Sequence, residues 1–511
     1  MSTWGGARLI AAGILLSRIS GLVRQKVIAW FLGDGDAADA LASAFRIPNF
    51  LQNLFGEGVL SASFIPAYAK LIAEGKREEA GRVAGAVASL LALTTAALVL
   101  FGVVASPLLV ALIAPGFDGE KRDLTIRLVR VIFPGVGLLV LSAWCLGVLN
   151  SHKRFFLSYV SPVLFNATMI VALLVAGPGE SPERVVMIAA WASVAGSLLQ
   201  FVVQLPTVWR LDRELRFTLD ASSPIVRGVA TRFGTVVVGR GVVQISGFVD
   251  TAIASLVSAG SVATLGYAQA LSMLPVSLFG MSISAAELPA MAGEQGSAQE
   301  VAAALRVRLD RGLGRIAYFV IPSAAAFLMI GGVIAAGLYE GGAFSAESAR
   351  WVWAALAGSA VGLLAGTMGR LYSSASYALG DARTPLKFAI VRVALGALLG
   401  WSLSLSLPGL LGLDPRWGIA ALTGASGFAA WVEFHLLRRA ISRRIGETGV
   451  PAAHLATLWA CAVAAGLAGA GTARLLDGRM ALVVAAVAVP VFGAVYLGLT
   501  RLLKADDARR A

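Results

Sequence analysis

Cysteine, histidine and charged residues are scarce in this sequence, and their scarcity excludes several classes of protein. Its two cysteines, Cys145 and Cys461, lie far apart in different apolar segments, so neither a disulfide framework nor a CxxC metal pair is available. The three histidines are too scattered for a convincing metal site. No GxxxxGK[ST] phosphate loop occurs, so nothing in the chain indicates ATP hydrolysis.

Apolar residues dominate instead. The chain has 511 residues, 58% of them hydrophobic and 14% charged, and it repeatedly contains apolar runs of about 20 residues, the length that crosses a bilayer. This pattern predicts an all-α polytopic membrane protein with about 14 transmembrane helices. The expected spans are 8–32, 37–70, 84–114, 124–150, 153–176, 185–209, 224–258, 262–291, 314–338, 347–379, 384–407, 416–442, 452–475 and 480–503.

The net charge is +13, and the Lys and Arg residues lie mainly in the short loops between these segments. Binding of nucleic acid would require Lys and Arg gathered on one domain or helix face, which is not the pattern here. Alternate loops carry about 24 and about 8 Lys and Arg residues. By the positive-inside rule, the richer loops and both termini are predicted to be cytoplasmic.

An internal repeat divides the chain. ISGLVR at 19–24 returns as ISGFVD at 245–250, and PNFLQNLFGEGVLSASFIP at 48–66 is echoed by PVSLFGMSISAAELP at 275–289. The copies are six helices apart, an even number, so both enter the membrane in the same direction. We therefore expect two parallel-repeat six-helix lobes, residues 1–220 and 221–445, followed by two C-terminal helices and a cytoplasmic tail in residues 446–511. Pro and Gly recur within both copies of the second motif and indicate bends or hinges.

Cations interrupt the first two apolar segments. Arg18, Arg24 and Arg46 would together cost roughly 7 to 10 kcal/mol if they faced lipid at the centre of the bilayer. We therefore expect them to border a watery cavity, although snorkelling to the interface or pairing with Asp39 or Glu57 would also accommodate them. A cationic cavity implies an anionic substrate, and guanidinium groups suit phosphate because they donate two parallel hydrogen bonds.

The stretches SRISGLVRQ and ADALASAFRIPNFLQNLFGEGVLSASFIP and the later DARTP together resemble the MurJ/MviN lipid II flippases of the MOP exporter superfamily. The resemblance runs from the first to the twelfth expected helix. It implies a bacterial cytoplasmic (inner) membrane protein, not an enzyme, that moves the undecaprenyl-linked peptidoglycan precursor from the inner to the outer leaflet by alternating access. Lipid II would then be its substrate, and the cell-wall synthesis machinery its candidate protein partner.

The resemblance also implies roles for individual residues. Arg18 and Arg24 match the first-helix arginines of the family, which engage the diphosphate and headgroup. Asp39, Asn49 and Glu57 match polar positions of its second helix. Asn49 carries an amide suited to hydrogen bonds with sugar or peptide groups of the precursor.

Some positions depart from the family pattern. A basic residue expected later in the second helix is Gln52, an amide that can also bind sugar or peptide groups, and the arginine of the eighth helix falls at about Ala270, where no charge remains. Arg240, in the seventh segment, is a cation at a position where the family does not lead us to expect one. We hypothesise that it replaces the charge missing at Ala270; the alternative is that it reaches the cytoplasmic interface.

Some members of the family bind sodium in the second lobe. Asp250 and Thr423 fit that pattern, whereas the positions near Gly396 and Gly400 have lost the expected Asn or Asp side chains. A hard cation needs several oxygen ligands, so we expect at most a weakened sodium site and no cofactor. Coupling to sodium, to protons or to the membrane potential alone stays open.

Two alternatives to lipid II transport remain. The same fold can export another polyprenyl-linked saccharide or amphiphile, and the neutral residue at Ala270 favours that reading. A protein of a different class would be a polytopic enzyme acting on lipid-linked sugars. Such an enzyme needs carboxylates or histidine on an extracytoplasmic loop, and the loops expected on that side are short.

Overall fold

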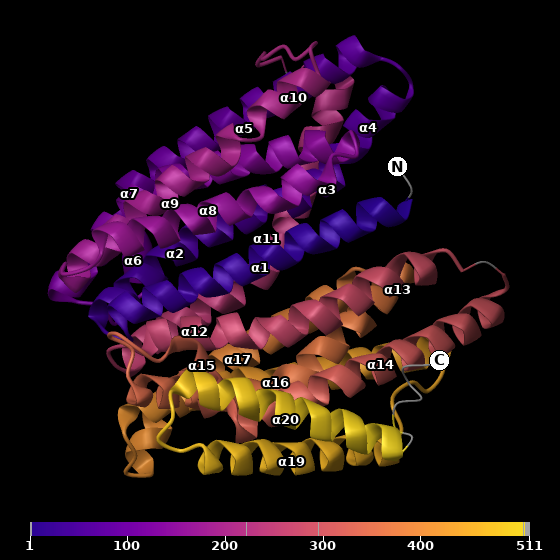
Figure 1. Ribbon diagram of the computed structural model, residues 1–511. Helices are drawn as coiled ribbons and strands as arrows, with labels where there is room; N and C mark the ends of the chain where they lie inside the picture. Colours follow the sequence, from indigo (N-terminus) through magenta and orange to yellow (C-terminus); the bar gives the residue numbers. More distant parts are fainter. Residues whose placement is uncertain (1–2, 221, 295, 504, 506–511) are drawn as a thin grey trace. The chain divides into compact units, whose positions relative to one another are not determined.

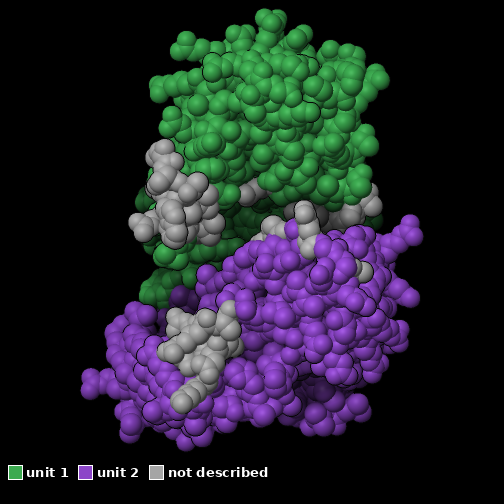
Figure 2. Space-filling model, turned by 90° about the vertical axis from the view of Figure 1, so that its right-hand side faces the viewer, with its two compact units in different colours: residues 1–248 green, residues 249–511 purple. Residues whose placement is uncertain are grey.

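The computed structural model describes residues 3–220, 222–294, 296–503 and 505. Within these ranges the side chains of residues 3–12, 14, 57, 238–243, 285, 289, 292 and 298 are not described. The regular structure of the described residues is helical, apart from one isolated bridge between Gly341 and Phe344. The chain divides into two compact units, Met1–Phe248 and Val249–Ala511 (Figures 1 and 2).

Unit 1 is a bundle of long helices joined by short connections (Figure 1). Its helices are α1 (Thr3–Leu32), α2 (Asp36–Phe55), α3 (Glu57–Ser63), α4 (Ile65–Ala73), α5 (Arg77–Val104), α6 (Ser106–Ile113), α7 (Gly119–Ser151), α8 (Phe155–Ala176), α9 (Pro182–Val202), α10 (Leu205–Leu211) and the first part of α11 (Pro224–Val257).

Unit 2 holds the end of α11 and the remaining helices. These are α12 (Ser261–Pro275), the π-helix η1 (Val276–Met281), α13 (Ser282–Ala292), α14 (Ala298–Met329), α15 (Gly331–Tyr339), α16 (Ala346–Ala378), α17 (Arg383–Leu410), the 3-10 helix η2 (Pro415–Trp417), α18 (Gly418–Ile445), α19 (Ala452–Leu475) and α20 (Ala481–Leu502).

The fourteen expected spans each overlap one helix or a run of consecutive helices, and the largest difference is at 314–338, because α14 already begins at Ala298. In the described part of the chain, ten helices are long and apolar enough to cross a membrane. The segments α1, α2–α4, α11 and α18 also have the length of a membrane span, and each of them carries charged side chains within its length.

The two units repeat one packing order. In unit 1, α7 packs on α2, α5 and α9, and α9 packs on α8; in unit 2, α16 packs on α12, α14 and α18, and α18 packs on α17. Corresponding helices begin between 221 and 236 residues apart, as at Asp36 and Ser261 or Gly119 and Ala346. The repeat expected from ISGLVR and ISGFVD is therefore also a repeat of helix packing. Helices α19 and α20 pack on each other, on α14 and on α15 within unit 2.

The second helix of each repeat is interrupted after a proline. In unit 1, α2 continues through Pro48 but ends at Gly56, whose extended backbone (φ −85°, ψ −152°) separates α2 from α3. A side chain at Gly56 would collide with the carbonyl oxygen of Gln52. In unit 2, the chain passes from α12 into the π-helix η1 directly after Pro275. The expected bends are thus present in both repeats, at different positions and with different geometry.

Polar contacts hold the helices together at the ends of each unit. We call one end of each unit its inner end; it carries the loops at 74–76 and 152–154 in unit 1 and the loop at 379–382 in unit 2. The opposite end of each unit is its outer end. At the inner end of unit 1, Tyr68 donates a hydrogen bond to Asp212 (2.9 Å) and lies 3.0 Å from Nε2 of His152. Burial lowers the pKa of His152; the Asp212 carboxylate opposes this shift and Arg77 adds to it.

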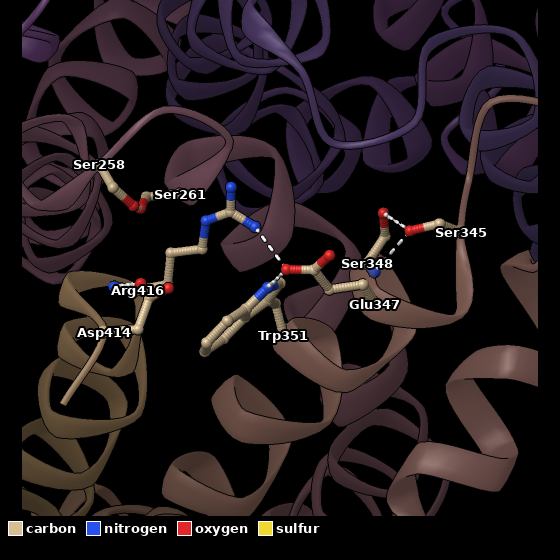
Figure 3. A network of polar contacts seen from close by, with 8 residues as sticks. All are labelled: Ser258, Ser261, Ser345, Glu347, Ser348, Trp351, Asp414 and Arg416. Carbon is tan, nitrogen blue, oxygen red and sulfur yellow. Dashed lines mark hydrogen bonds and ion pairs between the residues drawn. The ribbon is translucent and has the colours of Figure 1, made fainter.

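Figure 3 shows the outer end of unit 2. Glu347 on α16 accepts hydrogen bonds from Trp351 Nε1 (3.3 Å) and from Arg416 Nη1 (3.2 Å), which joins α16 to η2. Asp414 accepts from the backbone N–H of Arg416 (2.9 Å). These contacts fix the start of α18, the helix that carries Thr423, against α16.

Candidate functional site

Arg24 lies where α1 packs against α8. The two helices approach so closely that a side chain at Gly13 would lie 2.8 Å from Cβ of Tyr159. One to two turns later, Asn166 on α8 donates a hydrogen bond to the hydroxyl of Ser20 (2.9 Å). Arg24 follows Ser20 by four positions and therefore lies on the same face of α1.

The guanidinium of Arg24 contacts an aromatic ring but has a hydrogen-bond donor that is unpaired in the described part of the chain. Its central carbon lies 5.4 Å from the ring centre of Phe165 on α8, a cation–π contact. Its Nε atom is buried and has no hydrogen-bond partner among the described residues. A buried donor without an acceptor costs free energy, so an oxygen-bearing anionic ligand would complete this arrangement.

Arg18 has a different environment on the same helix. Its side chain is exposed, and it precedes Arg24 by six positions, which is about 240° around the helix and about 9 Å along it. The two arginines therefore do not form one stripe, and a single ligand that contacts both needs an extended headgroup.

The depths of the cations on α1 and α2 can be compared because only residues 33–35 join the two helices. Arg24 lies about 12 Å before the end of α1 and Arg46 about 15 Å after the start of α2, at 1.5 Å per residue. The same count puts Arg18 and Asn49 each about 20 Å from this connection. Arg46 is half-buried, Asn49 is exposed and Gln52, one turn further, is half-buried.

Asp39 belongs to an ion-pair cluster at the outer end of unit 1. Its side chain is fully buried, and Lys121 of α7 places its ammonium group 2.5 Å from Oδ2 of Asp39 and 2.8 Å from Oδ1 of Asp36. The ammonium also lies 4.2 Å from the ring centre of Phe117. These contacts join α2 to α7 and give Asp39 a structural partner that the sequence did not reveal.

Two predicted side chains lie outside the described residues, those of Glu57 and Arg240. Their backbones place Glu57 at the first position of α3, directly after the break at Gly56, and Arg240 in the middle of α11. Ala270, where the family carries an arginine, is a half-buried residue of α12. The idea that Arg240 replaces that arginine stays a prediction.

Asp250 contacts the part of α18 that carries Thr423. The hydroxyl of Ser426, which follows Thr423 by three positions, donates a hydrogen bond to Asp250 Oδ1 (3.2 Å). The Thr423 hydroxyl donates to carbonyl oxygens of its own helix, at 3.0 Å to Ile419 and 3.2 Å to Ala420.

The region around Asp250 offers few oxygen ligands for a cation. Gly396 and Gly400 on α17 face α18 there: side chains built at these glycines would contact Ser426 and Leu422, respectively. The described residues contain no group of three or more His, Cys, Asp or Glu suited to a metal ion. Asp250, Ser426 and Thr423 supply four side-chain oxygens, fewer than the roughly six to eight oxygen ligands of a hard cation such as Ca²⁺. The weakened sodium site stays a prediction.

Sequence reasoning missed three further charged residues inside membrane-length helices of unit 2. Arg370 lies on α16, Arg392 on α17 and Glu433 on α18, and Arg392 pairs with Glu433 at 3.1 Å. The signal that identified Arg18 and Arg24, a charge within an apolar span, applies equally to these residues. In the second repeat the prediction had singled out only Arg240 and Asp250 of α11 among the charged residues.

The sequence model of the family described as "Lipid II flippase MurJ" matches residues 28–488. The chain belongs to this family. The lipid II flippase MurJ of Burkholderia cenocepacia is 31% identical over 384 residues, which cover 74% of this chain and 73% of the relative. The probable lipid II flippase MurJ of Rhizobium tropici is 32% identical over 398 residues, 76% of this chain and 73% of the relative.

Solved structures of the MurJ family and its neighbours have the same fold. A lipid II flippase MurJ in an inward closed conformation matches with a TM-score of 0.78 and 22% identity, covering 98% of this chain and 99% of that one. An inward-facing multidrug resistance MATE family transporter of the MOP superfamily matches with a TM-score of 0.66 and 18% identity over 83% of this chain and 95% of that one. The expected all-α transporter fold is confirmed, and the chain is a multi-pass protein of the bacterial inner membrane.

Proposed function

We propose that this chain is a flippase that moves lipid II, an undecaprenyl-diphosphate-linked peptidoglycan precursor, from the inner to the outer leaflet by alternating access. Membership of the MurJ family supports the transport class and the lipid-linked substrate. The observation that carries the site assignment is the buried, unsatisfied Nε of Arg24 above the ring of Phe165. A diphosphate oxygen would supply the missing acceptor.

In this proposal the anionic headgroup is bound by three arginines in different ways: Arg18, Arg24 and Arg46. Arg24 binds the diphosphate from a fixed position on the α1–α8 contact, whereas exposed Arg18 follows the headgroup over a wider range. Arg46 approaches Arg24 in depth from α2, and Asn49 and Gln52 hydrogen-bond the sugar and peptide portions. The polyprenyl tail stays in lipid, and no covalent step is required.

The membrane potential is the energy source that we propose. A negative charge that moves outward across an inside-negative membrane gains about 2.3 kcal/mol per 100 mV. This direction agrees with the proposed topology, in which both termini and the Arg-rich loops are cytoplasmic. The few oxygen ligands near Asp250 argue against an obligatory sodium ion, and interaction with the cell-wall synthesis machinery is a further part of the proposal.

Complementation tests this function directly. The chain is expressed in a bacterium depleted of its own lipid II flippase, as wild type and as Arg24→Ala, Arg24→Lys and Arg184→Ala. Arg184 is an exposed arginine of unit 1 that pairs with Glu180 (3.1 Å), so it is a control for loss of a surface charge.

We expect growth with wild type and Arg184→Ala, partial growth with Arg24→Lys and none with Arg24→Ala at equal membrane abundance. Loss of two charge-assisted hydrogen bonds, each worth about 1.5–3 kcal/mol, is the reason. A well-expressed wild-type chain that fails to complement would redirect the proposal to another polyprenyl-linked cargo, which the neutral Ala270 favours. Full growth with Arg24→Ala would refute the site assignment.

A further inference from the structure

Arg370 is a cation within the membrane-length helix α16. Its side chain is exposed, and no hydrogen bond or ion pair joins it to another residue in the part of the chain that the structure describes. Gly366 and Gly369 of α16 face Ala430 and Leu437 of α18, so Arg370 lies at the level of Glu433 along this helix contact. Glu433 in turn pairs with Arg392 of α17. The group therefore contains two guanidinium groups and one carboxylate, with a net charge of +1.

Glu433 pairs directly with Arg392, so one carboxylate serves two guanidinium groups. Oε2 of Glu433 lies 3.1 Å from Nη1 of Arg392, and the Glu433 side chain is only 12% exposed. The Arg392 side chain is 39% exposed, so part of its guanidinium still faces outward from the pair. A phosphate group can accept hydrogen bonds from the free donors of both arginines.

Close helix packing fixes the positions of these side chains. A side chain at Gly362 of α16 would collide with Gly427 of α18, so these two helices touch at their backbones. On α17, Gly396 faces Ala429 of α18. Arg392 precedes Gly396 by one turn and Glu433 follows Ala429 by one turn, which brings the two charges together at the inner side of this contact.

The cluster lies at the depth of phosphate headgroups. Arg370 is about 12 Å from the inner end of α16, and Arg392 about 14 Å from the inner end of α17. Helix α16 is about 50 Å long, against a hydrocarbon core of about 30 Å, so its ends extend beyond the core. With the proposed orientation, the cluster lies near the boundary between the hydrocarbon and the headgroups of the inner leaflet.

We propose that Arg370 and Arg392 form a phosphate-binding site on unit 2 for an amphiphile of the inner leaflet. Its ligand is a lipid with a phosphate or diphosphate headgroup, supplied either by the polyprenyl-linked substrate or by an anionic membrane phospholipid. The assignment rests on the proposed orientation of the chain. It is independent of the site built around Arg24, which belongs to unit 1.

Snorkelling of the side chains to the interface explains the two neighbouring arginines less well than a phosphate ligand does. A single arginine can extend its charge to the interface, but a second guanidinium beside it opposes that charge, and Glu433 is already paired. An anionic ligand relieves the repulsion between Arg370 and Arg392 and satisfies the donors of both. Snorkelling alone predicts no preference for lipids that carry a phosphate.

Lipid binding to the purified full-length chain tests the site. Dissociation constants are measured by native mass spectrometry for undecaprenyl diphosphate, phosphatidylglycerol and undecaprenol, which has the same tail without a phosphate. The variants are Arg370→Ala, Arg370→Lys and the double variant Arg392→Ala/Glu433→Ala, which removes the ion pair without stranding a charge. Arg350→Ala is the matched control, since Arg350 is an exposed arginine at the other end of the same helix.

We expect Arg370→Ala to weaken binding of at least one phosphate lipid about tenfold to a hundredfold, the effect of one lost charged hydrogen bond. Arg370→Lys weakens it less, the double variant also weakens it, and Arg350→Ala and undecaprenol binding are unaffected. A loss confined to undecaprenyl diphosphate identifies a substrate site, and a loss confined to phosphatidylglycerol identifies a phospholipid site.

The proposal is overturned if Arg370→Ala leaves both phosphate lipids unaffected, or if Arg350→Ala or undecaprenol shows the same loss. Unchanged affinity in the double variant overturns the role of Arg392. Size-exclusion profiles and thermal midpoints establish that each variant is folded. The complementation result with Arg24→Ala does not depend on these measurements, so failure of this site and failure of the proposed function are distinguishable.

Discussion

Replacement of Lys121 with alanine would leave a fully buried carboxylate, that of Asp39, without the ammonium group 2.5 Å away. Lys121 itself is only 15% exposed, so water screens this pair weakly. Removal of one partner of a buried ion pair typically costs about 3–5 kcal/mol, because the remaining charge stays desolvated. We expect Lys121→Ala to lower the free energy of unfolding of the protein by about that amount.

The measurement is unfolding of the purified protein in mixed micelles with increasing denaturing detergent. Asp36→Ala is the control: Asp36 contacts the same ammonium group at 2.8 Å but is 65% exposed, and exposed pairs contribute about 0.2–1 kcal/mol. Asp39→Asn combined with Lys121→Met removes both charges and retains most of the side-chain volume. This double variant should recover most of the stability lost in Lys121→Ala.

Two outcomes would contradict a structural role for this pair. One is a change of less than about 1 kcal/mol in Lys121→Ala, far below the cost of a stranded buried charge. The other is an Asp39→Asn variant that keeps its stability and loses complementation, which would make Asp39 a substrate ligand, as the family resemblance implies.

Burial lowers the pKa of His152 below its usual value, so the folded state favours the neutral ring. The free energy of unfolding should therefore fall as pH drops below about 6.5. When unfolding is measured over a series of pH values, His152→Gln should show a weaker pH dependence than the wild type. Gly362→Ala should destabilise unit 2 by about 1–3 kcal/mol in the same unfolding assay, because the new methyl group collides with α18. Gly366→Ala, whose methyl group would lie 4.0 Å from its nearest neighbour, should be tolerated, and equal effects of the two variants would refute the packing argument. Asp250→Asn should leave transport equally active in sodium and potassium buffers; a sodium requirement that Asp250→Asn abolishes would show that the ligand set is larger than the structure indicates.

The sequence was sufficient for features that depend on local composition. Apolar length predicted the expected spans, and 153–176, for example, differs from α8 by two residues at its start. The break in 37–70 lies at Gly56, and α2 continues through Pro48. A proline removes one hydrogen bond, and only the packing around it decides whether the helix ends there.

Features that depend on contacts distant in sequence could not be predicted. The pair of Asp39 and Lys121 joins residues 82 positions apart, and Lys121 looked like an ordinary loop cation. The cation–π contact of Arg24 with Phe165 likewise required knowledge of which helix covers α1. Charge within an apolar span identifies a residue that needs a partner, but it does not say whether that partner is a ligand, an ion pair or an aromatic ring.

The contact between α1 and α8 also bears on how the protein enters the membrane. Phe165 is synthesised 141 residues after Arg24, which at 5–20 residues per second takes roughly 7 to 28 seconds. During that interval α1 has no α8 to cover its guanidinium, and each arginine in the core of an isolated helix costs about 2.5–3.5 kcal/mol. Helix α1 thus lacks its covering helix until α8 has been made, and an insertase that shelters Arg24 during that interval would favour its insertion.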